Sequence, residues 1–560
     1  MNNRLVGTIS LNAKGKGFVR IEGRDDDIQV EPTDVGIALS GDTVEIETFT
    51  GLKGLTFGKV TQIVERKKTQ FVGVVAPNEN PAPNAPKFAL IPDDKKSNIE
   101  IEIESTHKDS GITLSNIRDN VKAIVAITEW SLQDGRFPKG ELIKIIGEKG
   151  ENNAEMESIV LERGFDTTFP PEVIAEAEES AREYSSTNPS QEELSKRRDM
   201  RGVFTCTIDP FDAKDFDDAL SIRPLSESEK KKWSNDSQSY SRESLPEAFY
   251  EVGVHIADVA HYVRPGTALD REARKRAFSV YLVDRTIPML PSVLSNGMCS
   301  LNPHEDRFAF SAIFTMSKDG KILDKWFGRT IIHSDKRFTY EEAQSLLDEI
   351  KNGTIPKESV DEEAILSPSN WHVSPYALEI SEFNRLAKIM LKARQTNGSI
   401  DFETTEIKFK LDEQGRPIAV YKKERLDAHR LVEEYMLLAN REVAEYISTR
   451  NKEEHTEKFG VYRVHNSPDN ERLQDLGVFV RALGFDFNPT KNIGPKEVQK
   501  LLKDVEGSPA EAVIKIATLR SMAKATYATA NTGHFGLAFD FYTQFTSPIR
   551  RYPDLMVHRI

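Results

Sequence analysis

The sequence predicts a multidomain chain in which two small all-β barrels precede one large α+β domain. The amino-terminal region aligns with itself at a shift of 66 positions, which predicts two related modules. An acidic, helix-forming segment follows these modules. From residue 199 to residue 560, β-branched runs are mixed with amphipathic helical patterns, and no comparable break interrupts them. A chain of 560 residues is long enough for several such domains.

The two barrels are predicted from paired strand and turn patterns. Residues 5–9 (LVGTI) align with residues 71–75 (FVGVV), and the DTV at 42–44 has a counterpart in the DNV at 119–121. Short β-branched runs separated by Gly, Asp and Pro are typical of small barrels. We therefore expect one barrel over residues 1–66 and a second over residues 67–165.

The distribution of charge bears on the class of partner. The formal net charge of −14 argues by itself against a polyanionic partner. Residues 100–199, however, contain 22 acidic against 12 basic side chains, a balance of −10, so most of the excess lies in one segment. We expect residues 166–198 to form an acidic helical linker. The net charge of the whole chain therefore does not exclude a nucleic acid.

The large domain, expected over residues 199–560, is predicted from individual strands and helices. Residues 251–257 and 309–315 are rich in β-branched, aromatic and small apolar side chains, which indicates strands. A helix that begins at residue 427 and extends to residue 447 places Leu431, Tyr435 and Leu438 at spacings of three and four, as one buried helix face requires.

A strand expected over residues 202–208 runs directly into a dense group of acidic side chains. The five aspartates within ten positions are Asp209, Asp212, Asp215, Asp217 and Asp218. Like charges this close repel, so the group indicates a bound cation, and Mg²⁺ is an ion that proteins hold through a few carboxylates. Asp212 is the member that we assign to solvent or to a cap.

Two other interpretations of the acidic group are weaker. An EF-hand loop needs Gly at its sixth and Glu at its twelfth position, where this sequence has Lys214 and Leu220. A fully solvated acidic loop would not be interleaved with apolar side chains such as Phe211 and Phe216. The pattern indicates a partly buried turn.

Residues 14–19 (KGKGFV) and 41–45 (GDTVE) resemble the cold-shock type of OB-fold domain. In that family aromatic side chains of this strand stack on single-stranded bases, which implies an RNA-binding role for Phe18. Lys16 stands where the first aromatic residue is usual, and the second module keeps Phe88 without the glycines. The alternative is that Phe18 and Phe88 are core residues of ordinary barrels.

The acidic group and several further motifs resemble the processive exoribonuclease family that includes ribonuclease II and ribonuclease R, with ribonuclease R the nearer branch. The matching segments are 207–220 (TIDPFDAKDFDDAL), 254–259 (VHIADV), 276–282 (RAFSVYL), 287–291 (IPMLP), 294–301 (LSNGMCSL), 432–440 (VEEYMLLAN) and 545–554 (FTSPIRRYPD). The resemblance implies a catalytic domain of the ribonuclease II type. It also implies 3′→5′ hydrolysis of single-stranded RNA to nucleoside 5′-monophosphates.

The same resemblance assigns the residues that carry the chemistry. The implied metal ligands are Asp209, Asp215, Asp217 and Asp218. They would hold one or two Mg²⁺ ions, with Mn²⁺ as an alternative, and Asp217 takes the essential catalytic position. Arg550 would stabilise charge on the scissile phosphate in the transition state. For Arg551 the alternatives are a structural ion pair and a contact with the RNA backbone.

The resemblance further assigns side chains that hold RNA. Tyr281 and Phe402 would clamp bases near the 3′ terminus, because stacking on an aromatic face accepts any base. Tyr340 would lie near the point that sets the final product length. Glu434 would contact the terminal ribose, with the adjacent Glu433 as its rival.

The expected setting of the protein is the cytosol. No stretch approaches the roughly 18 consecutive apolar residues of a membrane span, and the first residues lack an apolar signal-peptide core. Cys206 and Cys299 cannot build a disulfide framework and fit a reducing compartment. We expect a monomer that binds single-stranded RNA and no membrane, and the sequence identifies no protein partner.

Two functions of other classes remain as alternatives. One is a catalytically inactive RNA-binding protein of the same fold, against which the intact aspartate set argues. The other is a Mg²⁺-dependent nucleotide phosphohydrolase, which would have no use for the barrels. Family members continue beyond the arginine motif, so we expect the end of the catalytic domain and a following OB-type domain to be missing from this chain.

Overall fold

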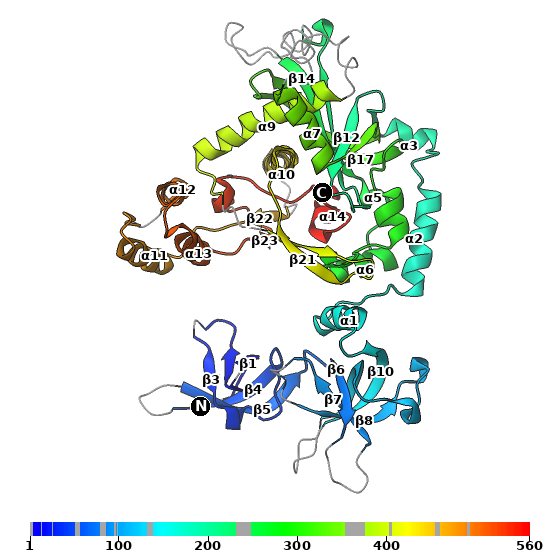
Figure 1. Ribbon diagram of the computed structural model, residues 1–560, viewed down its shortest axis with the longest axis vertical. Helices are drawn as coiled ribbons and strands as arrows, with labels where there is room; N and C mark the ends of the chain where they lie inside the picture. The colour runs from blue at the N-terminus through cyan, green and yellow to red at the C-terminus, as the bar shows by residue number, and fades with distance from the viewer. Residues whose placement is uncertain are drawn as a thin grey trace. The chain divides into compact units, whose positions relative to one another are not determined.

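The chain divides into two structural units. The computed structural model describes residues 4–560 apart from 13, 25, 51–55, 79–85, 95–96, 98, 131–137, 231–247, 353–375, 402–405, 454–459 and 490–492. The first unit comprises Met1–Thr168 with Asp412–Arg416, and the second comprises Phe169–Leu411 with Pro417–Ile560. In Figure 1 the first unit contains the blue and cyan barrels, and the second contains the green to red elements.

The first barrel is a closed sheet with the strand order β1-β2-β3-β5-β4. Its strands are β1 (Arg4–Leu11), β2 (Gly17–Arg20), β3 (Ile28–Val30), β4 (Thr43–Thr50) and β5 (Thr56–Glu65). Val44 and Ile46 point into the barrel beside Ile9 and Val19. On β4 the side chains that alternate with Val44 and Ile46 lie on the outside of the barrel, as the two-residue period of a strand predicts.

The second barrel repeats the architecture of the first. Its strands are β6 (Gln70–Pro77), β7 (Phe88–Pro92), β8 (Ile101–Thr106), β9 (Val121–Glu129) and β10 (Lys139–Glu148). They close in the order β10-β8-β7-β6-β9, which is the cyclic order of the first barrel. The helix α1 (Asn152–Glu162) follows. The predicted repeat and the predicted pair of barrels are confirmed.

Two glycines that match in the sequence repeat have the same structural role. A Cβ atom added at Gly7 would lie 2.4 Å from the Arg20 carbonyl oxygen, and one added at Gly73 would lie 2.1 Å from the Ile91 carbonyl oxygen. No side chain fits at these distances, so both positions need glycine for the first strand of each barrel to lie against the second.

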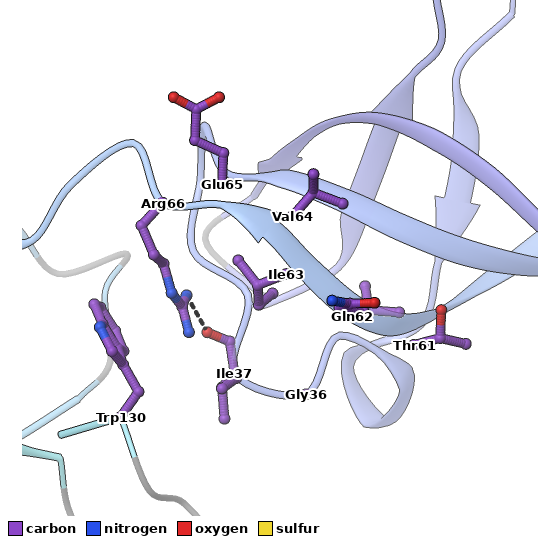
Figure 2. A pocket seen from close by; sticks show the side chains of 10 residues that line it. Gly36, Ile37, Thr61, Gln62, Ile63, Val64, Glu65, Arg66 and Trp130 are labelled. Atoms are coloured by element: carbon purple, nitrogen blue, oxygen red, sulfur yellow. Dashed lines mark hydrogen bonds between the residues drawn. The ribbon is translucent and has the colours of Figure 1, made fainter.

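An arginine connects the two barrels within the first unit. The Arg66 guanidinium lies 3.7 Å from the centre of the Trp130 ring and donates to the Ile37 carbonyl over 2.8 Å. Its Nη1 also bonds the Asp42 carboxylate at 2.6 Å. Figure 2 shows Arg66 beside Trp130 and bonded to Ile37, at the edge of a pocket of about 780 Å³ that the end of β5 lines. Arg66 thereby holds the end of β5 against the end of β9.

The second unit is built on a seven-stranded mixed sheet with the order β11-β18-β17-β14-β13-β12-β19. Its strands are β11 (Arg198–Asp199), β12 (Thr205–Asp209), β13 (Asp218–Pro224), β14 (Ala248–Ala257), β17 (Asp306–Ser317), β18 (Ile322–His333) and β19 (Lys336–Thr339). β12 runs antiparallel to β13 and parallel to β19. The end of β12, the start of β13 and the end of β19 therefore meet at one end of the sheet.

Helices cover both faces of this sheet. Phe314 and Ile313 are neighbours on β17 and belong to different cores, because alternate side chains of a strand point to opposite faces. The core around Phe314 includes α7 (Tyr340–Lys351), α9 (Ala377–Asn397) and α10 (Asp427–Glu453). The core around Ile313 includes α2 (Pro171–Glu183), α5 (Val259–Tyr262), α6 (Ala268–Arg276) and α14 (Tyr552–His558). The predicted α+β fold is confirmed.

Smaller elements complete the second unit. They are α3 (Gln191–Ser195), α11 (Asn470–Ala482), α12 (Pro495–Asp504), α13 (Glu511–Ser521), the π-helix η6 (Val293–Met298), and the strand pairs β15 (Val280–Tyr281) with β16 (Thr286–Ile287), β20 (Ile407–Leu411) with β21 (Pro417–Lys422) and β22 (Tyr462–Val464) with β23 (Thr526–Ala528). Helices α11, α12 and α13 share a core of their own. No helix in the described ranges has both the length and the hydropathy that a membrane span requires.

The segment expected to be an acidic linker differs from the prediction in its packing. Residues 166–198 are partly helical, but Val173, Ala177 and Ala181 of α2 are buried in a core of the second unit. The acidic side chains occupy the remaining faces of the helix. Because they outnumber the buried apolar residues, the sequence of this segment is typical of a solvated linker. The predicted domain boundaries otherwise stay predictions.

The contacts of Asp42 generate a stability prediction. This carboxylate is only 1% exposed and accepts from Arg66, from the Leu39 amide at 2.9 Å and from the Lys67 amide at 3.1 Å. Since Asp42→Ala removes the carboxylate partner of the part-buried Arg66 and the acceptor of two amides, we expect local opening of β4 and β5, measured by amide hydrogen exchange, to become easier by about 3–5 kcal/mol.

The matched control for this experiment is Asp27→Ala. Its ion pair with Arg20 at 3.1 Å is exposed to solvent, so removal should cost less than about 1 kcal/mol. Equal effects of the two substitutions would show that the Asp42 contacts do not stabilise the barrel.

Candidate active site

The four predicted metal ligands lie at one end of the large sheet. Asp209 is the last residue of β12, Asp218 is the first residue of β13, and the connecting loop carries Asp215 and Asp217. Because β12 and β13 are antiparallel, the chain returns to the place where it left the sheet. Asp212 is exposed on the loop. Five aspartates in ten positions thus separate into four that turn inward and one that faces solvent.

Bonds from distant parts of the second unit hold the aspartate loop. The Ser300 hydroxyl accepts from the Phe216 amide at 2.9 Å and donates to the Lys214 carbonyl at 3.2 Å. The Arg337 guanidinium donates to the carbonyl of Pro210 at 2.7 Å and to that of the next residue at 2.8 Å. Ser300 belongs to one of the matching segments, but the sequence predicts no role for it, because a contact between residues 84 positions apart leaves no local pattern.

Asp217 occupies the most constrained position of the group. Its side chain is 4% exposed. Oδ1 accepts from the Ile549 amide at 2.9 Å, and Oδ2 lies 3.4 Å from Nε of Arg550. Burial raises the pKa of Asp217 to about 8, although the Arg550 charge and the Ile549 amide both act to lower it. Burial is therefore the larger influence on this carboxylate.

The neighbouring carboxylates carry the same signature. Burial raises the pKa of Asp218 to about 6 against the opposing charges of two arginines, and burial also raises the pKa of Asp215. Burial and the charge of Asp218 raise the pKa of Asp209, whose Oδ2 is buried without a hydrogen-bond partner. The surrounding side chains therefore do not fully balance the negative charge at this end of the sheet.

The donor set fits a hard divalent cation, although it is not a closed cage. Across the described residues, no three acidic, histidine or cysteine side chains converge closely enough to form a complete metal-binding cluster. Carboxylate oxygens are nevertheless the ligands that Mg²⁺ takes in proteins, and it commonly completes its shell with water and substrate phosphate. The free oxygen of Asp209 and the uncompensated charge both fit such an ion.

The two adjacent arginines of the predicted motif have different surroundings. Arg550 has a side chain that is 43% exposed, and its Nη2 donates to the Ser547 hydroxyl at 2.9 Å. Arg551 instead bonds the fully buried Asp554 at 2.7 Å. Arg550 can therefore meet a ligand from solvent, whereas Arg551 forms the ion pair that was one of its two expected roles.

Two of the predicted RNA-binding tyrosines lie beside the aspartates. Tyr281 is 54% exposed, and partial burial with the nearby Asp215 charge raises its pKa to about 12. Burial and the charges of Asp218 and Asp209 raise the pKa of Tyr340. The Tyr340 ring stacks on His429, with ring centres 4.0 Å apart. His429 was not singled out from the sequence, because a lone histidine at the start of a helix carries no specific signal.

The remaining predicted RNA contacts have mixed outcomes. Glu434 is buried and paired with Arg394, whereas Glu433 is half-buried and paired with Arg425. Phe402 lies outside the described residues. Within the first unit, Phe18 is half-buried on the outer side of β2 and does not belong to the barrel core.

Phe88, by contrast, is buried in the core of the second barrel. The alternative of an ordinary core residue therefore holds for Phe88 and not for Phe18. The two modules share their architecture but differ at the position where the resemblance implied base stacking.

Family models match most of the chain. The model described as RNB domain matches residues 197–560, the cold shock domain model matches residues 90–170, and the model described as ribonuclease B OB domain matches residues 7–54. Along the chain, the three matches fall on the first barrel, on the second barrel and on the large α+β domain, in the order that the sequence predicts.

Curated relatives and a solved structure agree with these matches. The chain is 33% identical to ribonuclease R of Aquifex aeolicus and 34% identical to ribonuclease R of Thermotoga maritima, covering 99% of this chain and 70% of each relative. It also resembles a structure of Mycoplasma genitalium RNase R in complex with ribose-methylated single-stranded RNA, at a TM-score of 0.82 and 25% identity, over 99% of this chain and 78% of that one.

The surroundings of the two arginines generate a prediction. Arg551→Ala leaves the buried Asp554 without its cation, so we expect a loss of about 3–5 kcal/mol in the free energy of unfolding. Arg550→Ala removes a half-exposed partner of Asp217, which keeps its bond from Ile549, so we expect a loss of about 1 kcal/mol or less. Urea denaturation followed by circular dichroism measures both. Equal losses would contradict the division of roles between the two side chains.

Proposed function

The chain belongs to the ribonuclease R family of RNB-domain exoribonucleases, and we propose that it processively removes nucleoside 5′-monophosphates from the 3′ end of single-stranded RNA with the help of Mg²⁺. The observation that carries the proposal is the end of the sheet that carries Asp209, Asp217 and Asp218 beside the half-exposed Arg550. Metal-assisted phosphodiester hydrolysis needs acidic side chains that hold the metal ion, and a positively charged side chain beside them can neutralise the phosphate.

The aspartates would hold the metal. When bound, Mg²⁺ supplies an activated water and neutralises charge on the phosphoryl oxygens. Asp209 offers the oxygen that lacks a partner within the protein. Asp217 is orientated by the Ile549 amide, which occupies Oδ1 and leaves Oδ2 facing Arg550. Asp215 and Asp218 complete the proposed ligand set.

Arg550 would bind the scissile phosphate. Its backbone is fixed, because the Ser279 amide donates to its carbonyl at 3.0 Å and Ser547 bonds its guanidinium. A guanidinium held in this way can stabilise the additional negative charge of the transition state without a change in its own position. Arg551 supports it indirectly through the ion pair with Asp554.

Aromatic side chains would hold the 3′ end in a sequence-independent manner. Tyr281 leaves a large part of its ring open beside Arg550, so a terminal base can stack on it. Tyr340, backed by His429, would set the final product length. Phe402 and Glu434 stay in this proposal on the family resemblance alone, with Glu433 as the more exposed rival. Phe18 would contact RNA upstream.

The proposed setting is a monomer in the cytoplasm. Cys206 and Cys299 are both buried and free of disulfides, which suits a reducing compartment. Phe18 is half-buried on β2, so part of its side chain is open to a base. These features support RNA binding in a reducing compartment, and we propose that the chain binds no membrane.

A ladder assay with a 5′-labelled single-stranded 20-mer tests the function. We expect products that shorten step by step from the 3′ end in Mg²⁺ or Mn²⁺, and no products when EDTA removes the metal. Binding without cleavage would identify the inactive RNA-binding alternative. Cleavage confined to mononucleotides would identify the nucleotide phosphohydrolase.

Asp217→Asn tests the chemistry separately from binding. The amide keeps the shape of the side chain but loses the negative charge, so we expect hydrolysis to fall by at least about 10³-fold. Affinity for the same RNA should stay within a few fold of the parent. Asp212→Asn is the control, because that side chain is exposed on the same loop. A loss of RNA binding by Asp217→Asn would assign Asp217 to architecture instead.

A further inference from the structure

An exposed aromatic side chain next to the arginine motif has no role in the function described above. Phe278 is 41% exposed and forms an antiparallel bridge with Arg551. The segment around it is tied to the motif twice more, since the Ser279 amide donates to the Arg550 carbonyl at 3.0 Å and the Tyr552 amide donates to the Ala277 carbonyl at 2.8 Å. Phe278 therefore lies one residue from the backbone that fixes Arg550.

The backbone takes an unusual conformation to reach this position. Ala277 ends α6 with a φ of +60°, a region that costs free energy for a residue with a Cβ atom. Strained residues persist where the surrounding structure needs the geometry, and they concentrate at functional sites. Here the turn at Ala277 directs the chain from α6 to the bridge with Arg551 and leaves the Phe278 ring in solvent.

A second aromatic ring and a half-buried arginine extend the surface of Phe278. The Tyr527 ring lies 6.4 Å from the Phe278 ring, at an interplanar angle of 33°. Arg463 is the register partner of Tyr527 across β22 and β23, and its guanidinium lies 4.6 Å from the centre of the Tyr527 ring. The Tyr527 hydroxyl donates to Gln544, which fixes the ring. We call Phe278, Tyr527 and Arg463 the aromatic ledge.

The position of the ledge relative to the aspartates defines what can reach it. Asp217 is 4% exposed and Phe278 is 41% exposed, and the Arg550 side chain is 43% exposed, so Arg550 and Phe278 are both open to solvent whereas Asp217 is not. An RNA whose 3′ end lies at the aspartates must leave toward solvent, and Phe278 is an exposed aromatic residue that backbone bonds join to the arginine motif. The ledge combines ring faces with a cation, which are the groups that hold bases and phosphates of single strands.

We propose that the aromatic ledge is a second stacking site, which holds a nucleotide on the 5′ side of the bases at Tyr281. Phe278 provides the face for the base, Tyr527 supports that ring, and Arg463 attracts the adjoining phosphate. The inference rests on the proposed function, since it needs an RNA whose 3′ end lies at the aspartates. It adds RNA-positioning residues and does not assign them a part in bond cleavage.

The test measures affinity for a fluorescent single-stranded 12-mer by anisotropy, with the full chain carrying Asp217→Asn so that the RNA stays intact. Phe278→Ala should weaken binding by about 5- to 150-fold, the range that loss of one stacking contact gives. Phe278→Tyr should restore most of the affinity, because it restores a ring face. Phe278→Leu should bind as weakly as Phe278→Ala, because it restores only apolar volume.

Phe479→Ala is the matched control. Phe479 is 40% exposed on α11. The core that α11 shares with α12 and α13 contains none of the three residues of the aromatic ledge. The Phe479→Ala variant should bind RNA as the parent does. Thermal melts followed by circular dichroism confirm that each variant is folded, and the Leu variant separates stacking from packing if the Ala variant loses stability.

The outcomes separate the ledge from the proposed function. Suppose that the unmutated chain degrades RNA. If Phe278→Ala then leaves the affinity of the Asp217→Asn chain unchanged, or if Phe278→Leu binds as tightly as Phe278→Tyr, the proposed stacking site is wrong and the nuclease function stands. If the parent binds RNA without degrading it, the nuclease function is wrong, and the ratio of affinities still decides on the ledge. A parent that neither binds nor degrades RNA overturns both.

Discussion

The burial of negative charge at the end of β12 and β13 is the constraint on which the rest of the second unit depends. Carboxylates that leave water lose hydration, and the charges of their neighbours add to the cost. The structure meets part of this cost with the Ile549 amide and Arg550, and the raised pKa values of Asp217 and Asp218 indicate that the remainder is unmet. In the proposed function a divalent cation would provide that remainder, and the same cation would serve phosphodiester hydrolysis.

The contacts around Asp217 connect segments that are far apart in the sequence of the second unit. The amide that orientates Asp217 comes from a residue 332 positions away. The segment that carries it is fixed in turn by Asp554, which accepts from the Ser547 amide, and by the bridge to Phe278. The contacts of the arginine motif therefore form only when the sheet, α6 and α14 are assembled. Catalytic competence and completion of the fold are coupled through these few bonds.

Local patterns in the sequence predicted much of this arrangement. The helix expected from residue 427 is α10, and Leu431, Tyr435 and Leu438 are buried as their spacing required. The repeat predicted two barrels with one topology, and the interleaving of acidic and apolar residues predicted a partly buried turn. Patterns of this kind are visible because period, turn chemistry and local charge density are properties of a short segment.

Contacts between distant segments could not be predicted in the same way. Ser300 and His429 support the aspartate loop and Tyr340, but each meets its partner only after the sheet has formed. The acidic face of α2 concealed a buried face, so a packed helix was expected to be a linker. Net charge was misleading for a related reason, since function depends on where charge is placed. In the proposed function the densest acidic group would hold a cation.

The most direct test of the account is to locate the metal. Crystals of the chain grown with Mn²⁺ would be measured at the manganese absorption edge, where anomalous scattering identifies the ion. The account predicts Mn²⁺ within about 2–2.5 Å of carboxylate oxygens of Asp209, Asp217 or Asp218, with Arg550 facing the same side. Manganese bound elsewhere, with none at this end of the sheet, would contradict it.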